Sequence, residues 1–156
     1  MHRQDVVIFN QDNWAIQSRL EYRVRFALCS GHGKRRDNRG IHAKRGNPLQ
    51  RNCQYRLEGI TPPARLWTLS AHDLEDAVLF NADGRPSHLL SRQLLREPDG
   101  RFQIIAGPDL AARNWLEVGG SGAYKLILRL YDSPITATGR IVDAEMPSVS
   151  LVGCPS

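Results

Sequence analysis

The chain has 156 residues, of which 41% are hydrophobic and 24% are charged. That length suits one domain, and the composition is ordinary for a folded globular protein. The 13 glycines and 9 prolines indicate many turns between short elements. Together these features argue against a coiled coil, a collagen-like chain and wholesale disorder.

The formal net charge of +5 is concentrated in one segment, residues 31–52. Its basic residues are Lys34, Arg35, Arg36, Arg39, Lys44, Arg45 and Arg51, and Asp37 is its one acidic residue. The rest of the chain is close to neutral, so this is not a uniformly basic nucleic-acid binder. The segment also lacks interleaved aromatic residues for base stacking, and we expect a solvated loop rather than a site for nucleic acid or anionic lipid.

Targeting signals and cysteine motifs are sparse. No apolar run reaches about 18 residues, so we expect no transmembrane segment in this chain. The apolar stretch 6–9 is too short for the core of a signal peptide and is bordered by Asp5. Cys29, Cys53 and Cys154 form no Cys-x-x-Cys pair, which excludes a zinc ribbon or a thioredoxin-like site. Three cysteines allow one disulfide and one spare thiol.

The first half of the chain favours short strands. Residues 11–28 suit an amphipathic helix or a pair of strands, and the alternation of Tyr22, Val24 and Phe26 with arginines favours a strand. Strands are predicted at 54–58 and at 65–70, the second rich in aromatic and apolar residues. A short apolar run at 77–80 follows, and the Asp-Gly pair after it predicts a hairpin turn.

The second half continues the same pattern. Residues 87–97 favour a strand followed by a turn over a short helix, and a second Asp-Gly turn precedes a strand at 102–105. The stretch around Asn114 is expected to be irregular. The strongest strand is 124–131, with both faces partly covered, and a last strand is predicted at 149–152. The predicted core comprises Leu57, Trp67, Leu69, Ile104, Leu126, Leu128 and Leu130. Short strands separated by turns predict an antiparallel sandwich or barrel.

Five motifs occur in an order that is typical of a known family. They are Cys53-Gln54-Tyr55-Arg56-Leu57-Glu58-Gly59, Pro63-Ala64-Arg65-Leu66-Trp67-Thr68-Leu69-Ser70, Asp99-Gly100, Asn114-Trp115-Leu116 and Leu128-Arg129-Leu130-Tyr131-Asp132-Ser133-Pro134. Through them the chain resembles the bacterial family called domain of unknown function 1214 (DUF1214), over its C-terminal two thirds. Residues 1–45 match nothing expected of that family.

The resemblance implies an all-β fold, an antiparallel β-sandwich of jelly-roll type spanning residues 47–156. Residues 1–46 are then a basic and flexible N-terminal segment outside it. The family setting implies a bacterial protein that is exported or membrane-anchored. Because the family has no established reaction, the resemblance implies no substrate and no cofactor.

The resemblance also implies a disulfide between Cys53 and Cys154. Family members tend to carry both a cysteine before the Tyr-Arg strand and one at the extreme C-terminus. The first and last strands of a sandwich often lie side by side, which suits such a bridge. It persists only in an oxidising compartment and so agrees with export. Cys29 is then the spare thiol.

Two motifs invite a chemical interpretation. The stretch 119–123 approximates the Gly-x-Ser-x-Gly nucleophile elbow, but a strand follows it where the elbow needs a helix, so we expect a hairpin loop. The stretch 72–76 gathers His72 and three carboxylates, which suits a metal or acid–base site. At strand spacing His72 and Asp73 point to opposite faces, and we expect a solvated turn without a metal.

The remaining candidates are Asn114, Trp115 and Arg129. A tryptophan and an arginine beside one cleft stack on a sugar or grip a carboxylate. The structural alternative, which we favour, has Trp115 capping the sandwich and Asn114 bonding a loop backbone.

The leading hypothesis is an envelope-type β-sandwich module with a structural or ligand-binding role and no catalytic residues, cofactor or metal. Its ligand-binding candidates are Trp115, Asn114, Arg129 and His72. Its expected partner is a small molecule or an envelope component rather than nucleic acid. The alternative is a hydrolase or carbohydrate-active enzyme with a site near His72, Asp73, Asn114 and Arg129.

Overall fold

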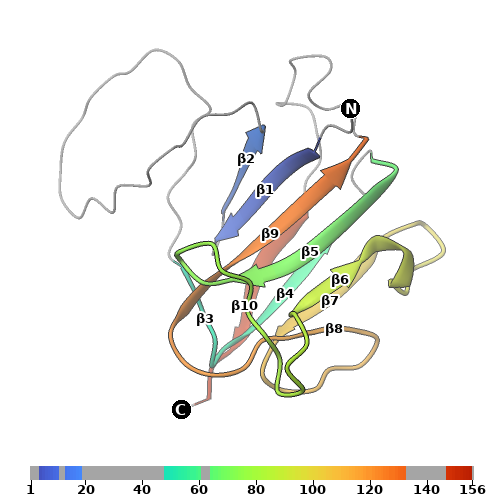
Figure 1. The fold of residues 1–156 in the computed structure, drawn as a ribbon. Coiled ribbons are helices and arrows are strands. Elements are labelled where there is room, and N and C mark those ends of the chain that lie inside the picture. Colours follow the sequence, from blue (N-terminus) through green and yellow to red (C-terminus); the bar gives the residue numbers. More distant parts are fainter. Residues whose placement is uncertain (1–3, 11–12, 19–47, 61–63, 133–146, 156) are drawn as a thin grey trace, which may run out of the picture.

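The computed structural model of the chain describes residues 4–10, 13–18, 48–60, 64–132 and 147–155. These residues form mostly β-structure in two sheets that do not close into a barrel, with no α-helix among them. Figure 1 shows the sheets as two layers, with β10 and β4 behind β9 and β5. The all-β prediction is therefore confirmed.

The larger sheet has six strands in the order β2-β1-β9-β5-β6, with β3 also paired to β9. The strands are β1 (Gln4–Asn10), β2 (Asn13–Ser18), β3 (Leu49–Gln50), β5 (Leu66–His72), β6 (His88–Leu90) and β9 (Ala123–Tyr131). All of its pairs are antiparallel. Strands β1 and β2 come from the segment before residue 47, so the chain there extends the sheet beyond the predicted sandwich. The predicted strand around Tyr22 to Phe26 lies outside the described residues.

The smaller sheet has four strands in the order β10-β4-β7-β8. They are β4 (Gln54–Gly59), β7 (Phe102–Gly107), β8 (Asn114–Glu117) and β10 (Ser148–Gly153). The first and last strands of the expected sandwich, β4 and β10, are thus antiparallel neighbours. The predicted strands 54–58, 65–70, 102–105, 124–131 and 149–152 are confirmed, each within two residues at its ends.

One strand pair departs from the expected antiparallel arrangement. Strands β7 and β8 are parallel, with Ile104 opposite Asn114 and Gly107 opposite Glu117. The six residues 108–113 carry the chain back along β7, so that β8 starts level with the middle of that strand. The stretch around Asn114, expected to be irregular, is therefore a strand. It is held by its own side chain, as described below.

The core lies between the two sheets. Every predicted core residue is buried, with Leu57 and Ile104 from the smaller sheet and the others from β5 and β9 of the larger one. Two aromatic pairs join the sheets: Trp67 packs on Phe102 with ring centroids 5.1 Å apart, and Tyr55 meets Tyr124 edge-on at 6.2 Å. Alternate residues of each strand thus build the hydrophobic layer that holds the sheets together.

The turns follow the predicted chemistry. Gly84 and Gly100, the glycines of the two Asp-Gly pairs, have φ values of 73° and 83°, in the left-handed region that glycine adopts without a Cβ clash. After β6 the chain makes the 3-10 helix η1 (Ser91–Gln93), so 87–97 begins as a strand and then turns. The Gly-rich stretch before β9 is a loop, as predicted.

The predicted disulfide is present. Cys53 and Cys154 are joined, with their Cα atoms 4.1 Å apart although they are 101 positions apart in the sequence. Because Cys53 precedes β4 and Cys154 follows β10, the bridge fastens the end of an edge strand to its neighbour.

Candidate functional site

A polar cluster lies on the outer face of the larger sheet, where β5 and β9 pair. Trp67, Leu69 and Ala71 of β5 face the core, so the alternate residues Ser70 and His72 face outward. Thr68 pairs with Arg129 and His72 with Lys125, which brings two cations of β9 onto the same face. We define the polar cluster as Ser70, His72, Asp76, Lys125 and Arg129.

His72 is not solvated as predicted, because only 1% of its surface is exposed. Its Nδ1 lies 2.9 Å from the carbonyl oxygen of Asp76, and its Nε2 lies 2.9 Å from Oγ of Ser70. The carbonyl can only accept, so the geometry assigns the ring hydrogen to Nδ1 and leaves Nε2 to accept from the Ser70 hydroxyl.

The surroundings of His72 favour this neutral form. Burial of the ring lowers its pKa below 6.5, and the positive charges of Arg129 and Lys125 lower it further. The hydrogen bond to the carbonyl of Asp76 and the carboxylate of that residue act in the opposite direction and do not outweigh burial. His72 is therefore a neutral base in contact with a hydroxyl group.

Arg129 reaches the same hydroxyl from the neighbouring strand. Its Nη1 donates to Oγ of Ser70 at 3.0 Å, and the arginine is half-buried. Ser70 itself is only 5% exposed. Its oxygen thus accepts from Arg129, and its hydrogen points to Nε2 of His72 at 2.9 Å rather than to the more distant carbonyl oxygen of Ile127 at 3.5 Å. No carboxylate of the described residues pairs with Arg129.

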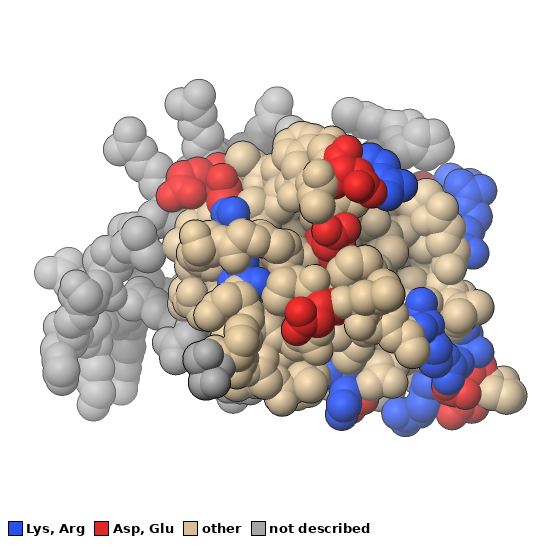
Figure 2. Space-filling view, turned by 90° about the horizontal axis from the view of Figure 1, so that it is seen from below, with Lys and Arg blue, Asp and Glu red and all other residues tan. Residues whose placement is uncertain are grey.

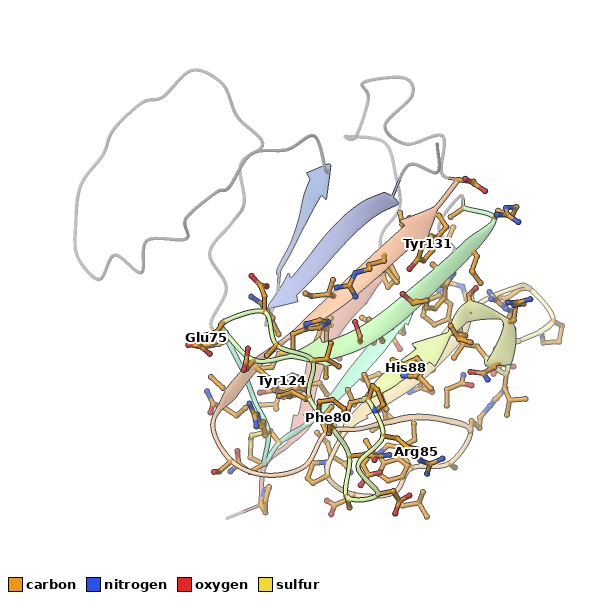
Figure 3. All side chains as sticks on the ribbon, viewed as in Figure 1. Glu75, Phe80, Arg85, His88, Tyr124 and Tyr131 are labelled. Carbon is orange, nitrogen blue, oxygen red and sulfur yellow. A yellow bond between two sulfur atoms is a disulfide. The ribbon has the colours of Figure 1, made fainter. Side chains whose placement is uncertain are left out.

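Lys125 fastens the turn that covers this end of the sheet. Its Nζ lies 2.6 Å from Oδ1 of Asp76 and donates to the carbonyl oxygen of Leu74 at 3.2 Å. Asp73 closes the turn from within, because its Oδ1 accepts from the backbone amides of Glu75 and Ala77. Figure 3 shows Glu75 on this turn, near the paired ends of β5 and β9.

Asn114 lies in the other sheet, away from this cluster. Its Nδ2 donates to the carbonyl oxygens of Leu95 and Gln103, and its Oδ1 accepts from the amide of Leu95, each at 2.8 Å. Asn114 is buried, so all of its hydrogen-bonding groups serve the backbone of a loop and a strand. This is the structural role favoured from the sequence.

Trp115 follows Asn114 and faces the outer side of the smaller sheet. It is half-buried opposite Ile105, and its Nε1 donates to the carbonyl oxygen of Gly107 at 3.1 Å.

Of the four residues of the predicted enzyme site, which are His72, Asp73, Asn114 and Arg129, the structure brings only His72 and Arg129 together. Asp73 caps its own turn, and Asn114 sits in the opposite layer.

The residue that sequence reasoning missed is Ser70, which links His72 to Arg129. A signal was present, because two polar residues two positions apart on a strand share one face. The contact with Arg129 had no such signal, since it depends on the register between β5 and β9.

The described residues hold neither a group of His, Cys, Asp and Glu side chains suited to a metal ion nor a helix able to cross a membrane. On the face seen in Figure 2, acidic and basic side chains are interspersed among other residues. The basic side chains of residues 34–45 lie outside the described ranges, so the predicted solvated loop stays a prediction.

Comparison of the sequence with models of known protein families identifies the family of this chain. The sequence model of a family described as a protein of unknown function, DUF1214, matches residues 39–135, more than half of the chain. The chain belongs to this family. The resemblance found in the five motifs is thereby confirmed.

Two solved structures are similar to this DUF1214 chain. The VPA0106 protein from Vibrio parahaemolyticus is 18% identical with a TM-score of 0.56, over 69% of this chain and 28% of that one. An uncharacterised protein from Burkholderia cenocepacia is 18% identical with a TM-score of 0.47, over 67% of this chain and 28% of that one. No curated protein matches the chain. The likeness to the Vibrio protein shows the fold alone, and the chain spans 28% of that protein's length.

Proposed function

We propose that this DUF1214 chain is a β-sandwich module of a bacterial envelope protein, with a structural or ligand-binding role and no reaction of its own. In this proposal its topology is of jelly-roll type, and it acts as part of a larger assembly of domains. The great length of the similar Vibrio protein relative to this chain supports the modular part.

The disulfide between Cys53 and Cys154 is the observation that carries the proposal. Disulfides persist in oxidising compartments and are rare where thiols are kept reduced. Among the described strands β10 pairs only with β4, so it is an edge strand of the smaller sheet that the bridge prevents from fraying. A protein exposed outside the cytosol gains most from such a fastening.

The ligand-binding part rests on Arg129 and His72. They are the two predicted ligand-binding residues that meet, through Ser70, on one outer face of the sheet. Trp115 offers a separate, half-buried aromatic surface on the other sheet. Asn114 has its polar atoms occupied by backbone groups and contributes rigidity rather than contact with a ligand.

The compartment and the thiol state in the cell test this proposal together. Cells expressing the native gene are treated with a thiol-blocking reagent before lysis and fractionation, and the protein is digested without reduction. We expect a linked peptide pair containing Cys53 and Cys154, recovered with the envelope fraction. Blocked thiols at both positions, in protein recovered with the cytosol, would overturn the proposal. A Cys29→Ser variant is the matched control and should give the same linked pair.

A hydrolase is the second candidate function, and one observation favours it. The hydroxyl of Ser70 donates to a neutral imidazole that is itself oriented by a carbonyl, which is how a base activates a nucleophilic serine. Against it, Ser70 is almost fully buried and its oxygen also accepts from Arg129. This candidate predicts ester turnover that disappears in both Ser70→Ala and His72→Ala.

A further inference from the structure

Arg129 is a half-buried cation whose charge nothing in the described residues neutralises. Within the described residues its side chain makes one hydrogen bond, from Nη1 to the Ser70 hydroxyl, an uncharged group. A guanidinium has five N–H donors, so most of its donors are unused by the described residues. Taking a cation out of water without a counter-ion is unfavourable, which makes such a group a candidate for binding an anion.

The other charges of the polar cluster do not serve Arg129. The carboxylate of Asp76 pairs with Lys125 at 2.6 Å, and those two charges cancel. His72 is neutral in the arrangement described above. The cluster therefore carries one net positive charge, located on Arg129, and a monoanion would balance it.

The Ser70–His72 pair fixes the direction in which Arg129 can act. Because Nη1 is held by Oγ of Ser70, the guanidinium is oriented by a side chain that is itself fixed by His72. The other edge of the planar group keeps two parallel N–H donors, the fork that matches the two oxygens of a carboxylate. Ser70 and His72 are thus positioning residues for Arg129.

We propose that Arg129 binds the carboxylate of a ligand on the outer face of the larger sheet, with Ser70 and His72 orienting the guanidinium. This inference rests on the ligand-binding role proposed above and names the chemical class of the ligand. It also assigns a role to the Arg129 guanidinium, the one charged group of the polar cluster that has no charged partner in the described residues.

Nuclear magnetic resonance of the full, ¹⁵N-labelled chain tests this directly. At about pH 7.5, above the ordinary pKa of histidine, the Nε–H signal of Arg129 is followed during titration with sodium acetate, sodium glucuronate, sodium phosphate or glucose. We expect saturable shifts with both carboxylates, in the millimolar range that suits so few contacts. Tighter binding of glucuronate than of acetate indicates an acidic sugar, whereas equal binding indicates recognition of the carboxylate alone. Both outcomes support the proposal.

Three variants complete the test, each checked for an unchanged β-sheet circular dichroism spectrum. Arg129→Gln should abolish the shifts of neighbouring backbone signals, and Arg129→Lys should weaken acetate binding roughly tenfold because it loses the fork. Arg56→Gln is the matched control, since Arg56 is also half-buried but lies on the other sheet, and it should bind normally.

Several results would overturn the proposal. They are the absence of a saturable shift at Arg129 with either carboxylate, binding that survives in Arg129→Gln, or phosphate binding tighter than both carboxylates. Because the wild-type signal is read directly, a variant that fails to fold does not remove the test. The binding measurement does not depend on the compartment of the protein. Carboxylate binding can therefore be refuted while the envelope proposal stands, and the envelope proposal can be refuted while carboxylate binding stands.

Discussion

Oγ of Ser70 lies 2.9 Å from Nε2 of His72, and these two residues occupy alternate positions of one strand. The pair shows how a β-strand places polar side chains together on the face that does not build the core. Arg129, from the adjacent strand, meets the same hydroxyl and completes a chain of hydrogen bonds from the Asp76 carbonyl to a guanidinium.

The buried His72 should make the folded protein sensitive to mild acid. Its pKa is lowered in the folded state, mainly by burial, so between that lowered value and about 6.5 the unfolded chain binds a proton that the folded chain does not. The free energy of unfolding should therefore fall as the pH drops through this window, by at most about 1.4 kcal/mol per pH unit from this residue. Urea unfolding from about pH 7.5 to pH 5 measures it.

The matched variants for this pH effect are His72→Gln and His88→Gln. His88 lies on the neighbouring strand β6 but is exposed. The pH dependence should become shallower in His72→Gln and remain in His88→Gln. If His72→Gln keeps the full dependence, the acid sensitivity comes from other groups.

Cys154→Ser should destabilise the domain strongly. Cys154 is exposed, so the substitution removes the bridge without disturbing the core at that end. In the chain-entropy model, opening a loop of this size costs about 4.7 kcal/mol. Denaturant unfolding under oxidising conditions should show a loss of that order, and the wild type with a reductant should approach the variant. A loss below about 1 kcal/mol would mean that the bridge contributes little beyond the ladder of β10 and β4.

The two core tyrosines should respond differently to loss of their hydroxyl groups. The hydroxyl of Tyr55 accepts from the backbone amide of Gln50 at 3.0 Å, so Tyr55→Phe should cost about 1 kcal/mol. The buried hydroxyl of Tyr124 has no partner in the described residues, and burial raises the pKa of this group. Tyr124→Phe should therefore be neutral or stabilising. Urea unfolding compares them, and a larger loss for Tyr124→Phe would show that its hydroxyl has a partner, such as a buried water.

Leu128 provides the test of the core assignment. It is fully buried in the middle of β9, so Leu128→Ala should lower the free energy of unfolding by roughly 2–5 kcal/mol. Gln103, exposed on β7, is the control, and Gln103→Ala should change stability by less than about 0.5 kcal/mol. A loss at Leu128 no larger than at the control would mean that its face of the strand is assigned wrongly.

The strands and core residues that local alternation defines were predictable from the sequence. The pattern of Leu126, Leu128 and Leu130 is visible in one strand, because side chains of a strand alternate between its faces. The pairing of β1 with β9 was not predictable, because nothing in the apolar run from Val6 to Phe9 indicates that its partner strand lies more than a hundred residues further along the chain. The parallel strand β8 was not predictable either. It has only four residues, and it is held by hydrogen bonds from Asn114 to backbone groups that come close only in the folded chain.

The candidate site could be predicted only in part, because the sequence shows the chemistry of each residue but not which strands pair. His72 and Arg129 were chosen from their chemistry, but their connection through Ser70 requires the pairing of Thr68 with Arg129 across two strands. Asp73 and Asn114 were chosen by the same chemical logic, yet both use their side chains on nearby backbone. The disulfide came from the family resemblance, because cysteine positions alone leave three pairings open.

The claim that this domain binds a ligand rather than catalysing a reaction is tested most directly by a fluorophosphonate probe, which forms an adduct with activated serines. Intact-mass measurement of the full chain after exposure to the probe reads the result in one step. We expect no adduct, because Ser70 is buried and its oxygen already accepts a hydrogen bond from Arg129. An adduct mapped to Ser70, and lost in His72→Gln, would contradict it and establish the hydrolase instead.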